Sequence, residues 1–181
     1  GRLDAIHAGM IFRTASPELL PKVADPALNG LTLEQGGFSA QGQPVFLFGA
    51  TLPTLDREAL ATLRRYQLNT ATLALGPEDK PGAVQDVPAQ MTRLRDVLDA
   101  AVAQNVSIMV QLAPEQTSPD FLAAHPDVKH DGFVDIGHPE VKAEWEKYFA
   151  QIAPVLKGQP MLAGISLAND PHFHFSGIEV R

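Results

Sequence analysis

The residues with the greatest chemical potential form a short polar and aromatic segment near the end of the chain. Asn169, Asp170, His172 and His174 all follow an apolar run at residues 161–167. Such a run predicts a buried strand, and parallel α/β sheets carry their chemistry directly after the strands. Asp170 could transfer a proton and Asn169 could bind a ligand through its amide. The alternative is a plain turn, because Asn-Asp-Pro is also common turn sequence.

Histidines and a carboxylate elsewhere in the chain add weaker candidates. His172 and His174 could both face a cleft, but two ligands without a neighbouring carboxylate are a poor metal signal, so no metal is predicted. The long connection at residues 113–136 contains Glu115 and His125. Loops of this length in compact domains are usually functional or disordered. Both residues could therefore contact a ligand, with a solvated surface as the alternative.

The elements that must position these residues follow from hydrophobic periodicity. Apolar runs predict strands at residues 45–50, 69–75, 106–112 and 161–167. Amphipathic patterns predict helices between them, at residues 55–66, 88–104 and 139–156. Strands that alternate with helices require a parallel sheet with right-handed crossovers. Periodicity leaves open whether that sheet is doubly wound or closed into a barrel.

The first of the four runs has a special interpretation. Residues 45–50 read Val-Phe-Leu-Phe-Gly-Ala and are bounded by Pro44 and Pro53. A continuous apolar run of this kind is typical of a strand that is buried on both faces. We therefore expect it to be the first strand of the parallel sheet and to be covered on both sides.

Composition excludes several classes of partner. The chain has 14 basic and 21 acidic residues and a formal charge of −7, which opposes binding to nucleic acid or to an anionic membrane. No apolar run approaches the roughly 18 residues of a membrane span. The absence of cysteine removes disulfides and thiolate chemistry. Phosphate-binding and dinucleotide-binding glycine motifs are also missing, so no cofactor is predicted.

Several segments resemble one large group of proteins in their order and spacing. Residues 166–174 look like the fourth strand of the clan A retaining glycoside hydrolases, where the motif is Asn-Glu-Pro and the closest pattern is β-galactosidase-like or agarase-like. Residues 42–49 and 68–71 are similar to the first and second strands of those barrels. Residues 119–122 and 125–126 are similar to the loop after their third strand.

This resemblance implies a fold and a domain plan. It implies the α/β class and a (β/α)₈ TIM barrel, of which residues 41–181 supply about the first four βα units. Residues 1–40 would be a lead-in segment or a linker from an accessory β-domain. Asp170 would be the acid/base, and the nucleophile would follow a seventh strand outside this chain. The residues that would contact substrate are Asn169, His172, His174, His125 and Glu115.

The function that follows is a glycoside hydrolase that acts on a neutral polysaccharide or a β-galactoside by a retaining mechanism. The alternative is a catalytically silent barrel that binds carbohydrate or acts as a scaffold. Asp170 separates the two, because its carboxyl is one methylene shorter than that of the Glu expected there, and proton transfer depends on placement. A third possibility is an unrelated α/β enzyme with an open sheet.

The same interpretation predicts partners and a compartment. A half-barrel leaves two exposed strand edges, so we expect a carboxyl-terminal half-barrel or another chain to cover them. The other partner would be the carbohydrate substrate, with no nucleic acid and no membrane. An extracellular or periplasmic location would suit an enzyme that degrades polysaccharides.

Overall fold

A computed structural model describes residues 26–34, 36–52, 54–76, 87–112, 117–130 and 133–166. The strands are β1 (Thr32–Glu34), β2 (Gly37–Ala40), β3 (Gln43–Val45), β4 (Gly49–Leu52), β5 (Thr70–Leu75), β6 (Ser107–Leu112), β7 (Lys129–His130), β8 (Phe133–Val134) and β9 (Leu162–Ser166). The helices are α2 (Arg57–Arg65), α3 (Val87–Gln104), α4 (Pro119–Ala124), the short 3₁₀ helix η3 (Pro126–Val128) and α5 (Pro139–Leu156).

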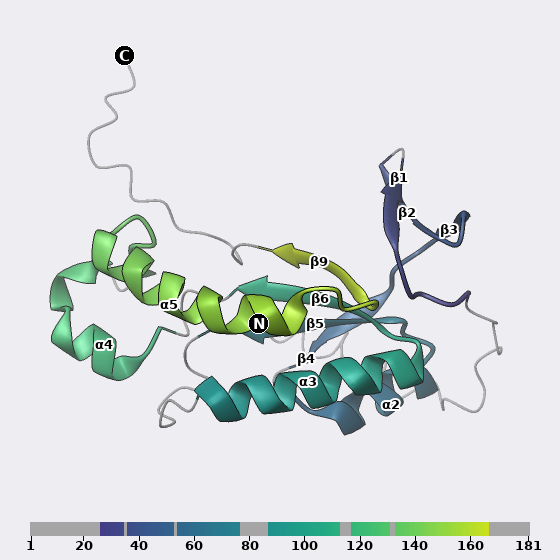
Figure 1. The fold of residues 1–181 in the computed structure, drawn as a ribbon, viewed down its shortest axis with the longest axis horizontal. Helices are drawn as coiled ribbons and strands as arrows, with labels where there is room; N and C mark the ends of the chain where they lie inside the picture. Colours follow the sequence, from purple (N-terminus) through teal and green to yellow (C-terminus); the bar gives the residue numbers. More distant parts are fainter. Residues whose placement is uncertain are drawn as a thin grey trace, which may run out of the picture.

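The centre of the fold is a parallel sheet of four strands in the order β4-β5-β6-β9 (Figure 1). Each strand pairs in parallel with the next one in the chain, so Ala50, Ala71, Ile108 and Leu162 lie side by side across the sheet. Sequential order confirms the prediction of adjacent parallel strands. In the common doubly wound orders the first strand lies inside the sheet between two others, whereas here it stands at one end of the described strands.

Helices α2, α3 and α5 form one layer against this sheet. Helix α3 packs against α2 on one side and α5 on the other. The side chains that face the layer alternate along the strands, and Leu73, Val110 and their neighbours at every second position are buried in the same core as residues of all three helices. A doubly wound sheet would carry helices on both faces. The chain is therefore an α/β structure in which α2, α3 and α5 cover one side of a parallel sheet.

The predicted first strand differs from the observed one. The apolar run at residues 45–50 is divided between β3 and β4, and Phe46 and Phe48 are 81% and 60% exposed. The prediction that this run is buried on both faces is wrong. The physical reason is position, because Phe46 and Phe48 lie in the connection between β3 and β4, and only Gly49 and Ala50 of the run enter the parallel sheet.

Asn69 and Gly49 fix β4 against β5. The Asn69 carboxamide donates to the carbonyl of Phe46 at 2.9 Å and accepts from the backbone N–H of Phe48 at 2.8 Å. At Gly49 a Cβ would lie 2.6 Å from the carbonyl carbon of Thr70 and would overlap its oxygen. Only glycine allows the two backbones to approach this closely.

Residues 26–45 pack beside the amino-terminal ends of the parallel strands. Leu28 is fully buried, and the Asn105 side chain holds its segment by accepting from the N–H of Leu28 at 2.7 Å and donating to the carbonyl of Pro26 at 2.9 Å. The antiparallel strands β1, β2 and β3 follow. Since Asn105 lies two residues before the start of β6, this lead-in segment is tied to the edge of the sheet that lies opposite the strand carboxyl ends.

Candidate functional site

The candidate site is the face of the parallel sheet that the described helices leave open, at its carboxyl-terminal edge. In β5, Thr72 and Ala74 are partly exposed where Leu73 and Leu75 are buried, and in β6 Gln111 is partly exposed in the same way. Because of this alternation, one face of the sheet carries polar and small residues, and the opposite face carries the apolar residues that contact the helices.

Register places the polar side chains of different strands in one row. Ala74 pairs with Gln111, and Gln111 pairs with Ser166, the last residue of β9. Gly164 lies in the next row beside Met109, where a Cβ would stand 3.2 Å from the Met109 sulfur. The row nearest the strand carboxyl ends therefore contains an amide and a hydroxyl.

These groups can hydrogen-bond but cannot transfer a proton near neutral pH. The described residues on the open face are threonine, serine, glutamine, methionine, alanine and glycine, with no carboxyl, imidazole or amine among them. Acid–base chemistry at this edge would have to come from side chains that follow the strands. Asn169 and Asp170 occupy that place in the sequence, since β9 ends at Ser166.

Most of the residues predicted for the site lie outside the described part of the chain. These are Asp170, Asn169, His172, His174 and Glu115. His125 is described and lies at the end of α4, where its ring stacks on Phe121 with centroids 4.5 Å apart and an interplanar angle of 29°. In Figure 1, α4 lies beyond the carboxyl ends of the strands. His125 is thus on the expected side of the sheet, with part of its surface covered by Phe121.

Buried hydrogen bonds that sequence reasoning missed hold the segments after β5 and β6. The Tyr148 hydroxyl donates to Oε1 of Gln90 at 2.9 Å, and Nε2 of Gln90 donates to the carbonyl of Gly76 at 3.0 Å. Gly76 is the residue directly after β5. The only sequence signal was a glutamine on the apolar stripe of α3, where it is 2% exposed.

Trp145 makes the corresponding contact after β6. Its indole N–H donates to Oγ1 of Thr117 at 3.3 Å, and Thr117 is 1% exposed. Trp145 itself is 7% exposed and belongs to the core. Hydrogen bonds from α5 therefore help to hold residues that follow the ends of two neighbouring strands, β5 and β6.

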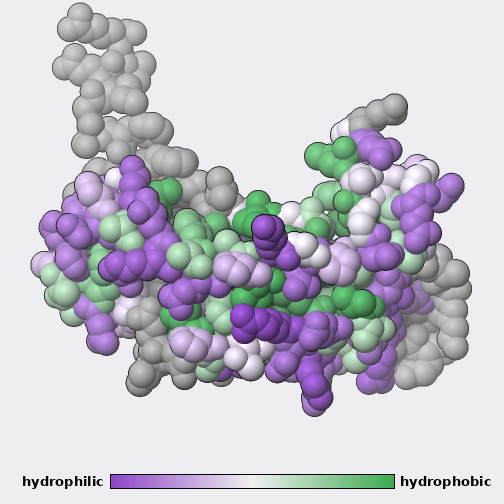
Figure 2. Space-filling view, viewed as in Figure 1, coloured by the Kyte–Doolittle hydropathy of each residue, from purple (hydrophilic) through white to green (hydrophobic). Residues whose placement is uncertain are grey.

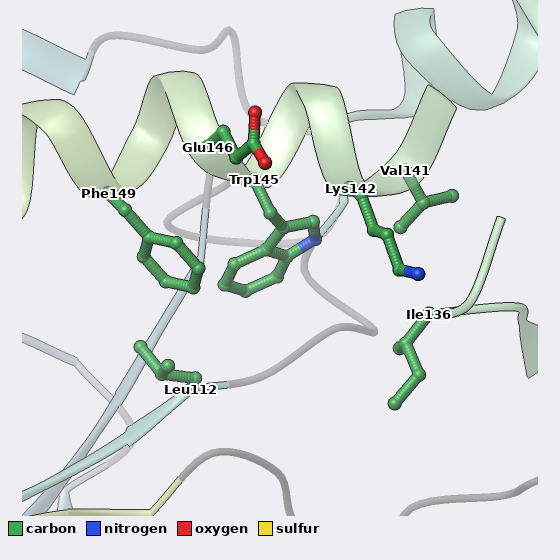
Figure 3. A pocket seen from close by; sticks show the side chains of 7 residues that line it. All are labelled: Leu112, Ile136, Val141, Lys142, Trp145, Glu146 and Phe149. Carbon is green, nitrogen blue, oxygen red and sulfur yellow. The ribbon is translucent and has the colours of Figure 1, made fainter. Parts of the chain in front are cut away.

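A recess of about 300 Å³ opens beside Trp145, on the helix side of the sheet. Figure 3 shows side chains of α5 above it, Leu112 at the end of β6 below it and Ile136 at its side. The full lining is Leu112, Ile136, Val141, Lys142, Trp145, Glu146 and Phe149. Leu112 is in register with Leu75 on the helix-facing side of the strands, so the sheet separates this recess from the open polar face.

Two other features bear on the kind of site. Within the described ranges, no group of three or more His, Cys, Asp or Glu side chains is placed to hold a metal ion. None of the helices described combines the length and the hydropathy needed to cross a bilayer.

No protein-family model matches the chain, and neither does any curated protein. Among solved structures, the chain is similar to an endo-1,4-β-mannanase from Eisenia fetida, with 17% sequence identity and a TM-score of 0.48. The similar region covers 76% of this chain and 44% of the mannanase chain. The chain thus spans less than half the length of that neighbour.

Proposed function

We propose that this chain is part of a (β/α)₈ barrel that acts on carbohydrate, as a retaining glycoside hydrolase for a neutral polysaccharide or a β-galactoside. One observation carries the proposal. The parallel strands β4, β5, β6 and β9 stand in chain order with helices α2, α3 and α5 in one layer, and Asn-Asp-Pro follows the fourth strand in the sequence. Barrels place their catalytic residues in the segments after the strands.

The open face supports closure into a barrel. Parallel sheets are almost always covered on both faces, and in a barrel the second face is turned toward the interior. Thr72, Gln111 and Ser166 would then line the interior near its carboxyl-terminal mouth. Hydroxyl and amide side chains there suit a neutral polyol, which offers both donors and acceptors.

Exposed apolar side chains at the two borders of the sheet support further βα units. Phe46 and Phe48 are exposed beside β4, and Ile165 of β9 is 48% exposed at the other border. Figure 2 shows apolar residues reaching the surface beside β9, whereas the outer surface of the helices is largely hydrophilic. A carboxyl-terminal half-barrel or another chain would cover both borders and pair the edge strands.

The chemistry needs two carboxyl groups about 5 to 5.5 Å apart, one to protonate the leaving oxygen and one to attack the sugar. We assign Asp170 as the proton donor and Asn169 as the ligand of the sugar 2-hydroxyl, with the nucleophile supplied by a strand outside this chain. The other proposed substrate contacts are His172, His174, His125 and Glu115.

A silent carbohydrate-binding barrel is the second candidate, and the residue at position 170 favours it. Asp170 stands where the resembling family has Glu, so its carboxyl reaches one methylene less far toward a leaving oxygen. The groove would then bind sugar without cleaving it.

The test uses the protein with its complete barrel and compares the cleavage rates of substrates with poor and with good leaving groups. Asp170→Asn should abolish cleavage of natural glycosides, which need protonation, and should spare activated aryl glycosides, which need little. Asp96→Asn on the exposed side of α3 is the matched control and should leave both rates unchanged. Equal loss on both substrate types would contradict the acid role.

Asp170→Glu separates the two candidates. A gain in rate would identify the natural protein as a weakened or silent member, and a strong loss would show a groove built around the shorter acid. Sugar binding without any cleavage in either protein would replace the hydrolase proposal with the binding one.

A further inference from the structure

The recess beside Trp145 has the size and shape of a small-molecule site. Its volume of about 300 Å³ lies at the lower end of the range for ligand pockets, and it is bounded by β6 below and α5 above. Val141 on α5 and Leu112 on β6 are 1% and 5% exposed, whereas Phe149 is 37% exposed. The recess is thus closed between α5 and β6 and more open on the side of Phe149.

Its lining is apolar apart from two charged side chains of α5. Lys142 and Glu146 are one helical turn apart, at positions where an ion pair is possible. Neither forms an ion pair with any residue in the described ranges, although Lys147 on the same helix bonds Glu144 at 3.3 Å. Figure 3 shows the Lys142 ammonium turned toward Ile136 beside the recess and the Glu146 carboxylate turned away from it.

We propose that this recess binds a small molecule with an aromatic or branched apolar body and a single carboxylate. The apolar body would lie between Trp145, Phe149 and Leu112, and the carboxylate would meet the Lys142 ammonium. The two charged side chains favour a ligand with a carboxylate, because the Lys142 ammonium lies at the recess and the Glu146 carboxylate points away from it. A sugar fits less well, since most of its hydroxyl groups would face apolar walls and lose their hydrogen bonds with water.

The proposal is independent of the proposed carbohydrate activity. Leu112 faces the helix layer, while Gln111 and Ser166 face the open side, so a ligand in the recess would not touch Gln111 or Ser166. Occupation would instead touch α5, the helix whose Trp145 and Tyr148 hydrogen bonds hold the segments after β6 and β5.

The experiment uses the chain's single tryptophan as its reporter. The 181-residue chain is titrated with phenylacetate while Trp145 emission is recorded with excitation at wavelengths that phenylacetate does not absorb. For a ligand of about ten heavy atoms we expect saturable binding with a Kd on the order of 1 to 10 mM. Phenylacetamide, which has the same shape without the charge, should bind at least threefold more weakly.

Variants locate the site. Lys142→Met keeps an apolar stem but removes the ammonium, and it should weaken phenylacetate binding three- to tenfold while leaving phenylacetamide binding unchanged. Phe149→Ala should weaken the binding of both probes. Lys147→Met, on the same helix but outside the recess, is the matched control and should bind both probes as the natural chain does.

Three results would overturn the proposal. They are no saturable change of Trp145 emission, equal affinity for phenylacetate and phenylacetamide, or unchanged phenylacetate binding by Lys142→Met. Circular dichroism and thermal unfolding of each variant identify a folding defect, and in that case Lys142→Gln replaces the failed variant and is held to the same criterion. Glycosidase assays do not enter this test, so its failure leaves the carbohydrate proposal standing, and the reverse also holds.

Discussion

Replacement of Asn69 by alanine should be one of the most damaging single changes in the parallel sheet. The Asn69 side chain joins the start of β5 to the segment before β4 through two hydrogen bonds, one that it donates and one that it accepts. It bonds Phe46 and Phe48 at 2.9 and 2.8 Å and also accepts from the Thr70 hydroxyl at 3.1 Å. Asn69 is 6% exposed.

The size of the effect follows from those contacts. Each hydrogen bond contributes about 0.5 to 1.5 kcal/mol net, and a buried partner left unsatisfied costs about 1 to 3 kcal/mol. The backbone partners here are only part-buried, so water can restore some of the loss. We therefore expect Asn69→Ala to lower the free energy of unfolding by roughly 2 to 3 kcal/mol. With a urea dependence of roughly 1 to 3 kcal/mol per molar, the midpoint should fall by about 0.7 to 3 M.

Equilibrium urea unfolding of the chain, followed by Trp145 emission and far-ultraviolet circular dichroism, measures this loss. Gln151→Ala is the control, because it removes one exposed 3.4 Å hydrogen bond on α5 and should change stability by less than about 0.5 kcal/mol. Asn69→Asp keeps the acceptor for Phe48 but cannot donate to Phe46, so it should not restore full stability. A loss below about 0.5 kcal/mol in Asn69→Ala would refute the reasoning, since both backbone groups would then be satisfied without the amide.

Three further changes test the packing. Gly49→Ala should destabilise the chain by about 1 to 3 kcal/mol or prevent folding, because the new Cβ would overlap the backbone of Thr70; thermal unfolding measures it, and an unchanged midpoint would contradict the close approach. Tyr148→Phe should cost about 1 to 2 kcal/mol by removing the hydroxyl that donates to buried Gln90, and a double-mutant cycle with Gln90→Ala should show the coupling. Asp56→Ala should cost about 1 kcal/mol through loss of the α2 amino-terminal cap, as urea unfolding would show.

Local pattern in the sequence predicted the elements well because helix and strand signals depend on neighbouring residues. The helix predicted at residues 139–156 has those bounds in the structure, and the strand predicted at residues 106–112 is observed at Ser107–Leu112. The apolar run at residues 45–50 was misinterpreted for the same reason. Its composition is that of a buried strand, but both of its phenylalanines lie in the connection between β3 and β4 and are exposed.

In the candidate site, too, some residues can be recognised from local sequence and others cannot. Asn169 and Asp170 stand out in the sequence because polar residues follow an apolar run, and their roles remain predictions. Gln90 did not stand out. Its partners Tyr148 and Gly76 are 58 and 14 positions away in the chain, so only folding reveals that this glutamine joins two helices to the end of β5.

By itself, the sequence determined that strands and helices alternate, and this requires a parallel sheet joined by crossovers. It left the order of the strands open, because the same periodicity suits a doubly wound sheet and a barrel. The tertiary structure decided that order and placed helices α2, α3 and α5 in one layer, leaving Thr72 and Gln111 on the open face. The physical reason is that strand order depends on contacts between segments far apart in the chain, and periodicity within a segment carries no information about them.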